Sequence, residues 1–235
     1  KEDSVSKKSN YKIISGPIFA NIILADEINR TPPKTQAALL EAMRENKVTA
    51  AGVTYQLPQT FFVLATQNPI ELEGTYPLPE AQLDRFMFNL WLEYPSFKEE
   101  IKIVETTTSE YKANLSKVLN ANQILEFQEL VRKVPVADNV VEFAVKVANM
   151  TRPVNGNSPQ FIKDWITWGA GPRASQYLIL AAKTKAVIAG RFTPNIDDVR
   201  SAMLPVLRHR IITNFSAEAD GIKSIDVIER LSKEV

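Results

Sequence analysis

The chain has 235 residues, of which 45% are hydrophobic and 23% charged, and its formal net charge is +1. This length suits one large domain or two ordinary ones, and the balanced charge gives no broad basic field for nucleic acid. The lack of cysteine excludes disulfides and cysteine-ligated zinc, and no apolar run reaches the roughly 20 residues of a membrane span. The first residues also lack the apolar core of a signal peptide, so we expect a cytoplasmic protein without a membrane partner.

The first part of the chain alternates between strand and helix patterns. Strands are predicted at 11–15, 22–25, 61–66 and 88–92, with a helix over 32–46 that places Leu39, Leu40 and Met43 on one face. Residues 48–57 alternate apolar and polar side chains around Gly52, which predicts a short hairpin. The apolar run at 22–25 is typical of a parallel strand buried on both faces.

The second part has helical periodicity only. Helices are predicted at 97–106, 121–133, 138–151, 172–189, 197–212 and 224–233. Because Tyr94-Pro95-Ser96 separates the two patterns, we place the domain boundary near Pro95. The sequence therefore predicts an α/β domain over 1–95 and an all-α domain over 96–235.

Two adjacent carboxylates, Asp26 and Glu27, follow the apolar strand. Ligands bind beyond the carboxyl ends of parallel strands, and nucleoside triphosphatases place a magnesium-binding acid and a water-orienting acid there. A second interpretation is that the two acids cap the helix that follows, since Asn29 to Pro33 has the composition of a helix start.

Further motifs follow in an order that supports the first interpretation. The next strand ends in Thr66-Gln67-Asn68, and a polar loop over 74–86 ends in Arg85 and Phe86. Residues 169–174 read Gly-Ala-Gly-Pro-Arg-Ala. Together with 24–30 and 37–43, these stretches resemble the MoxR family of AAA+ ATPases over nearly the whole chain. The resemblance implies part of an AAA+ parallel-sheet core with helices on both faces, followed by an all-α lid.

The resemblance also assigns roles to five residues. Asp26 is the metal and nucleotide ligand, and Glu27 is the base. Asn68 is the sensor that positions the lytic water and the nucleotide. Arg85 is a catalytic arginine finger that reaches the neighbouring subunit, with a structural pair to Asp84 or Glu80 as the alternative. Arg173 is a second sensor that contacts the γ-phosphate, although it could also be an ordinary first-turn arginine, which a helix N-terminus disfavours unless an anion is near.

The family resemblance implies ATP and Mg²⁺ as cofactors and a homo-oligomeric ring, which we expect to be a hexamer. It further implies remodelling of a protein client or metal insertion, with a von Willebrand factor A domain protein as a partner. We expect no nucleic-acid partner. The lone His209, between Arg208 and Arg210, has no second ligand at metal-binding spacing and is expected to have a surface or packing role.

One family feature is absent from these 235 residues. No Gly-Lys pair occurs, and hence no GxxxxGK[ST] phosphate-binding loop. In the family this loop precedes the strand at 22–25, so we expect that roughly a quarter to a third of the full protein lies upstream and that this chain alone is inactive. The alternative is a non-hydrolysing scaffold or interaction subunit that binds no nucleotide.

Overall fold

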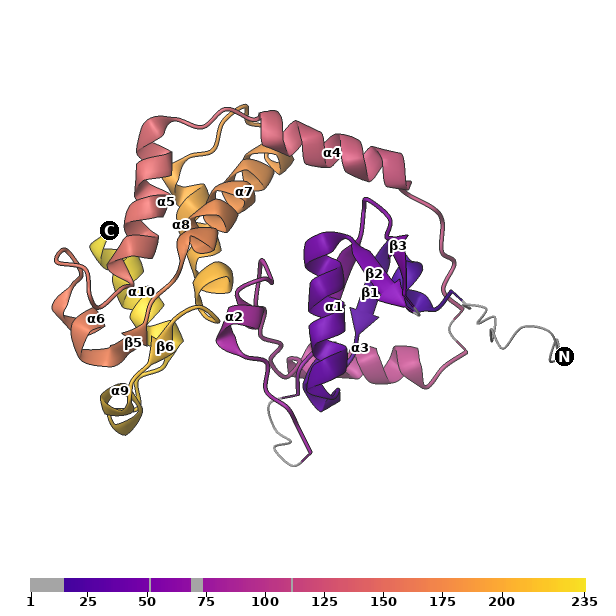
Figure 1. Ribbon diagram of the computed structural model, residues 1–235, viewed down its shortest axis with the longest axis horizontal. Coiled ribbons are helices and arrows are strands. Elements are labelled where there is room, and N and C mark those ends of the chain that lie inside the picture. Colours follow the sequence, from indigo (N-terminus) through magenta and orange to yellow (C-terminus); the bar gives the residue numbers. More distant parts are fainter. Residues whose placement is uncertain (1–14, 51, 69–73, 111) are drawn as a thin grey trace, which may run out of the picture. The chain divides into compact units, whose positions relative to one another are not determined.

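The computed structural model describes residues 15–50, 52–68, 74–110 and 112–235 (Figure 1). The chain divides into two compact units, Lys1–Gln82 and Leu83–Val235, which are treated separately below. Most of the strand predicted at 11–15 lies outside the described residues. The predicted domain boundary near Pro95, where helical sequence begins, stays a prediction.

The first unit is an α/β unit around a short parallel sheet. Strands β1 (Ile22–Ala25) and β4 (Phe62–Ala65) pair in parallel, with Ala25 opposite Ala65. Helix α1 (Pro33–Glu45) lies between them in the chain, and β2 (Lys47–Ala50) pairs antiparallel with β3 (Val53–Gln56). Short 3-10 helices span Pro17–Phe19 and Ile28–Arg30. The predicted strands at 22–25 and 61–66, the helix and the hairpin are therefore confirmed.

One face of this parallel sheet is uncovered within the described residues. The register pairs Ile22 with Phe62 and Leu24 with Leu64, and these four side chains are 49–63% exposed. The prediction that the strand at 22–25 is buried on both faces is therefore wrong for this chain. An exposed apolar sheet face is a liability for solubility.

The second unit is mainly helical. Helix α2 (Glu80–Leu83) crosses the division between the units. The later helices are α3 (Phe97–Thr107), α4 (Ala121–Lys133), α5 (Asp138–Met150), α6 (Gln160–Trp165), α7 (Pro172–Ile188), α8 (Ile196–Leu207), α9 (Phe215–Ala219) and α10 (Ser224–Glu234). Six of these were predicted. Helices α6 and α9 were not predicted from the sequence, and they are only six and five residues long.

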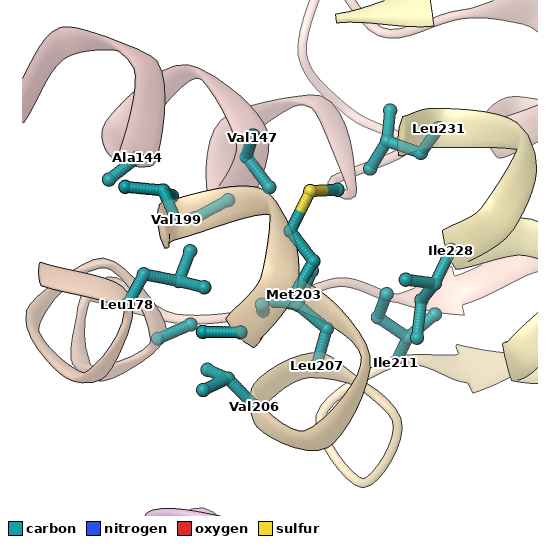
Figure 2. Close-up of a cluster of buried hydrophobic side chains, with 14 of the residues drawn as sticks. Ala144, Val147, Leu178, Val199, Met203, Val206, Leu207, Ile211, Ile228 and Leu231 are labelled. Atoms are coloured by element: carbon teal, nitrogen blue, oxygen red, sulfur yellow. The ribbon is translucent and has the colours of Figure 1, made fainter. Parts of the chain in front are cut away.

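The core of the second unit forms where α5, α7, α8 and α10 pack together. Figure 2 shows Leu178 of α7, Val199, Met203 and Leu207 of α8, and Leu231 of α10 converging in this core. Each of these five side chains is at most 1% exposed. A continuous apolar core of this kind gives the unit its own source of stability.

Two predictions about the second unit are wrong. Residues 88–92, all described, form no strand, and the Asn89 amide instead donates to the Pro205 carbonyl of α8 at 2.9 Å. Helix α8 ends at Leu207 rather than at 212, because β6 (Ile212–Thr213) pairs antiparallel with β5 (Ile166–Trp168). The described part of the second unit thus contains one two-stranded ribbon among its helices.

Candidate functional site

In the first unit, a threonine links the two strand ends that carry the predicted acids. The Thr66 hydroxyl, just beyond β4, donates to Asp26 Oδ1 at 2.6 Å and accepts from the Glu27 amide at 2.8 Å. The parallel register brings these residues together, because Ala25 and Ala65 are opposite each other and the next residues leave the same edge. Asp26 is exposed and Glu27 is half-buried, so both carboxylates lie at an accessible edge.

Glu27 has an unusual backbone conformation. Its φ of 48° and ψ of 51° place it in the left-handed region, which costs a non-glycine residue roughly 1–2 kcal/mol. The bond from its amide to Thr66 and the bond from the Ile28 amide to the Thr66 carbonyl, at 3.0 Å, hold this conformation. Its carboxylate also pairs with Arg30 at 3.0 Å, where both side chains are over 40% exposed. The turn therefore fixes where the Glu27 side chain begins.

Asn68 lies at the same edge and is held through a neighbouring loop. Asn29, which is 9% exposed, donates to the Asn68 carbonyl at 3.3 Å. Gln36 of α1, which is 2% exposed, donates to the carbonyls of Ile28, Thr31 and Tyr76 at 2.9–3.1 Å. These buried amides tie the start of α1 to the sheet edge, so Asp26, Glu27 and Asn68 are gathered on one preformed surface.

In the second unit, a tightly packed glycine turn sets the start of α7 and hence the position of Arg173. A Cβ atom on Gly169 would lie 2.3 Å from the Thr151 carbonyl oxygen, so only glycine fits there. The Ala170 amide donates to the buried Thr151 hydroxyl at 2.8 Å, and Pro172 is the first residue of the helix. Arg173 follows at the second helical position, which is suited to contact with an anion.

That anion, within the second unit, is the carboxylate of Asp84. Arg173 Nη1 donates to Asp84 Oδ2, and Arg210 Nε donates to Asp84 Oδ1 at 2.8 Å. Arg173 at a helix N-terminus thus already has an anionic partner inside the chain, although one carboxylate shared by two guanidinium groups leaves this cluster with a net positive charge. Asp84 is also not paired with Arg85, whose guanidinium has no hydrogen bond or ion pair among the described residues. The alternative of an Arg85–Asp84 pair is therefore not seen.

Next to this cluster, His209 is half-buried and has the packing role expected from the sequence. Its Nε2 lies 3.1 Å from the Phe86 carbonyl and 2.7 Å from Arg210 Nη1. Burial, and secondly the positive charge of Arg210, lower the pKa of His209 to about 4. His209 is therefore neutral near pH 7 and adds no further charge beside Arg173 and Arg210.

The structure thus gathers the predicted residues in two sets, one in each unit. The first set is Asp26, Glu27 and Asn68, and the second contains Arg85 and Arg173. Sequence reasoning gave no role to Thr66 or Arg210, although both lie within or beside quoted motifs. Thr66 could have been noticed because it directly follows the predicted strand that neighbours the strand before Asp26. Arg210 could have been noticed because it belongs to the charged run 208–210 at the end of an apolar helix.

The comparisons with known proteins agree with these motifs. Residues 3–88 match the family model of the ATPase family associated with various cellular activities (AAA), and residues 161–231 match the AAA lid domain. Chaperone MoxR1 of Mycobacterium tuberculosis is 42% identical over 94% of this chain and 58% of its own length. The chain belongs to the MoxR family of AAA+ ATPases. This MoxR-family chain therefore spans less than two thirds of the length of MoxR1.

Two further matches cover more of the other protein. The uncharacterized protein YeaC of Bacillus subtilis is 39% identical over 98% of this MoxR-family chain and 69% of its own length. The crystal structure of a proposed ATPase from Cytophaga hutchinsonii has a TM-score of 0.90 and 37% identity, over 96% of this chain and 69% of the other. The AAA+ α/β core and lid predicted from the sequence are thereby confirmed. Within the described residues, no helix is long and apolar enough to cross a membrane.

The acids of this MoxR-family chain suit a magnesium ion bound together with phosphates. Within the described residues, no three His, Asp or Glu side chains gather to form a metal cage. Mg²⁺ is usually held by one or two carboxylates plus substrate phosphates. Thr66 occupies Asp26 Oδ1, and Oδ2 has no hydrogen-bond partner among the described residues. Thr66 thus orients the Asp26 carboxylate and leaves its second oxygen available to a ligand.

Proposed function

We propose that the whole protein hydrolyses ATP with Mg²⁺ at the sheet edge formed by β1 and β4. When bound, Mg²⁺ would neutralise charge on the phosphates that meet at this edge. Asp26 would hold the metal through the oxygen that Thr66 leaves available, and Glu27 would orient and polarise the attacking water. Asn68 would position that water against the terminal phosphate. The observation that carries the proposal is the Thr66 hydroxyl bridging Asp26 and Glu27.

The strained backbone of Glu27 supports its proposed role as base. Non-glycine residues in the left-handed region persist where the surroundings hold them, and such residues are concentrated at functional sites. Here the bond from the Glu27 amide to Thr66 supplies that support. A fixed backbone sets where the Glu27 side chain begins, which reduces the freedom that is lost when its carboxylate positions the lytic water.

We also propose roles for two arginines of the second unit. Arg85 would act in trans, because its guanidinium has no partner among the described residues and can bind charge developing on a neighbouring subunit's phosphoryl group. Arg173 would contact the γ-phosphate in its own subunit and exchange Asp84 for that phosphate. Hydrolysis would then require a homo-oligomeric ring, which we propose to be a hexamer.

The name of the relative MoxR1 supports a chaperone role for this ring. We propose that the ATPase cycle remodels a protein client or inserts a metal, with a von Willebrand factor A domain protein as a partner.

A mixing experiment tests the trans role in the full-length protein. Arg85→Ala removes the finger but keeps the base, whereas Glu27→Gln removes the base but keeps the finger. Each variant alone should bind ATP yet lose at least about a hundredfold in turnover, since an arginine finger contributes on the order of 10³–10⁵ in rate. Mixing them should restore part of the turnover, and a mixture as inactive as its components would reject the assignment.

A non-hydrolysing scaffold is the second candidate, since these 235 residues themselves contain no Gly-Lys pair and the residues that would bind the phosphates are not among them. Such a subunit would lend Arg85 to its neighbours without binding nucleotide. Equilibrium binding of a fluorescent ATP analogue to the full-length protein separates the two candidates, because only the enzyme binds the analogue in a Mg²⁺-dependent way.

A further inference from the structure

The backbone around Arg85 is held by side chains from helix α7 and from the turn after α8. Four consecutive carbonyls, at residues 84–87, accept hydrogen bonds from them. Arg210 Nη2 donates to the carbonyls of Asp84 at 2.8 Å and Phe86 at 2.7 Å, and Arg210 Nη1 lies 3.4 Å from that of Met87. The Tyr177 hydroxyl of α7 donates to the Arg85 carbonyl at 3.0 Å. All of these residues belong to the second unit.

Arg210 is the centre of this arrangement. Its side chain is 1% exposed, and its Nε donates to the Asp84 carboxylate at 2.8 Å. Its Nη1 also donates to the Val206 carbonyl. Nε, Nη1 and Nη2 therefore all face acceptors, and the buried guanidinium is paired with Asp84. Lysine has three donors on one atom and cannot reproduce this planar fork.

Within the described residues, the Arg85 backbone is held by hydrogen bonds, whereas the end of its side chain is not. Its carbonyl is fixed by Tyr177, yet its guanidinium has no hydrogen bond or ion pair among the described residues. A fixed backbone with an unpaired cationic end is the arrangement a residue needs to reach a ligand outside its own unit. Holding the base of a long side chain reduces the freedom lost when its tip binds.

We infer that Arg210 is a positioning residue for Arg85: it locks residues 84–87 onto the lid and thereby aims the Arg85 side chain. This inference rests on the proposed trans role of Arg85. Asp84 is shared by both arginines of the cluster, since one carboxylate oxygen pairs with Arg210 and the other with Arg173. The Asp84 carboxylate therefore contacts Arg173 and also helps to hold the backbone that orients the Arg85 side chain.

The first test measures the backbone directly in the full-length protein. Because the backbone of this segment is hydrogen-bonded, we expect trypsin to cleave after Arg85 only when the segment opens. Arg210→Lys keeps the number of tryptic sites constant. Loss of several hydrogen bonds should raise the rate of cleavage between Arg85 and Phe86, followed by mass spectrometry, at least about tenfold. Arg132→Lys, at an exposed position in α4, is the matched control and should leave this rate unchanged.

The second test measures the finger itself, using Arg85→Ala as the acceptor subunit. The donor carries Glu27→Gln, so only its finger contributes, and the donor is compared with and without Arg210→Lys. Restored turnover should fall at least about tenfold with the additional change, while ATP-analogue binding by Arg210→Lys alone stays within about twofold. Tyr177→Phe, which removes one hydroxyl and keeps the ring beneath Arg210, should give a smaller loss if Arg210→Lys does not fold.

The outcomes separate the two claims. Unchanged cleavage together with undiminished restoration overturns the positioning role of Arg210. If Glu27→Gln fails to restore Arg85→Ala at all, the trans role fails and so does the aiming of the finger, while the cleavage rate still decides whether Arg210 anchors residues 84–87.

Discussion

The neutral His209 makes the stability of the lid depend on pH in a defined direction. Burial and the charge of Arg210 lower its pKa from 6.5 to about 4, against weaker opposing effects of the Phe86 carbonyl and Asp84. The folded state therefore binds this proton less readily than the unfolded state. The contribution of this pKa difference to the free energy of unfolding is fully present above about pH 6.5 and is lost as the pH falls towards 4.

The size of this effect follows from the two pKa values. Their difference of about 2.5, at roughly 1.4 kcal/mol for each pH unit, gives about 3 kcal/mol at most. Between about pH 7.5 and pH 4.5, the part lost is about 2.5 kcal/mol. All three tryptophans, Trp91, Trp165 and Trp168, lie in the second unit, so tryptophan fluorescence reports on the unfolding of that unit alone.

The assay is urea unfolding of the wild type and His209→Gln at both pH values. Glutamine can donate to the Phe86 carbonyl or accept from Arg210, but it does not titrate. Asp198, whose pKa is lowered mainly by its hydrogen bond from Arg191, also weakens the fold in acid, but it does so in both proteins. The wild type should lose about 2.5 kcal/mol more than the variant on acidification. Equal losses in the two proteins would refute the reasoning.

Three further predictions concern packing and the proposed metal site. Leu178→Ala should lower the free energy of unfolding of the lid by about 3 kcal/mol in the same fluorescence assay, whereas Ile188→Ala, exposed on the same helix, should change it by less than about 0.5. Gly169→Ala should cost about 2 kcal/mol or more in that assay, because its Cβ would collide with backbone; a neutral effect would mean that the turn can move. Thr66→Val should raise the Mg²⁺ concentration for half-maximal ATP turnover of the full-length protein about tenfold, with exposed Thr54→Val as the unaffected control.

Elements with strong local signals could be predicted from the sequence. The apolar run at 22–25, the periodic pattern of α1 and the pattern of α5 each determine an element through nearby residues. Two strands in parallel place their following residues at one edge, so the proximity of Asp26 to residues 66–68 also follows from local patterns. The strand predicted at 88–92 does not form, because an apolar segment by itself does not supply a partner strand.

Contacts between distant residues could not be predicted in this way. Arg210 meets Asp84 across 126 positions, and no local pattern distinguishes it from the exposed arginines of the lid. The partner of Arg173 could not be predicted either. An anion of any kind is favoured near a helix N-terminus, and the sequence does not indicate whether that anion is a phosphate or Asp84. The family resemblance supplied the roles of Arg85 and Arg173, which remain predictions.

ATP turnover by the full-length protein and its Glu27→Gln variant, measured together with nucleotide affinity, is the most direct test of the central proposal. The variant should bind an ATP analogue as tightly as the wild type and lose at least about a hundredfold in turnover, as expected for removal of a general base. Turnover that is undiminished in Glu27→Gln, or a wild-type protein that binds no nucleotide, would contradict it.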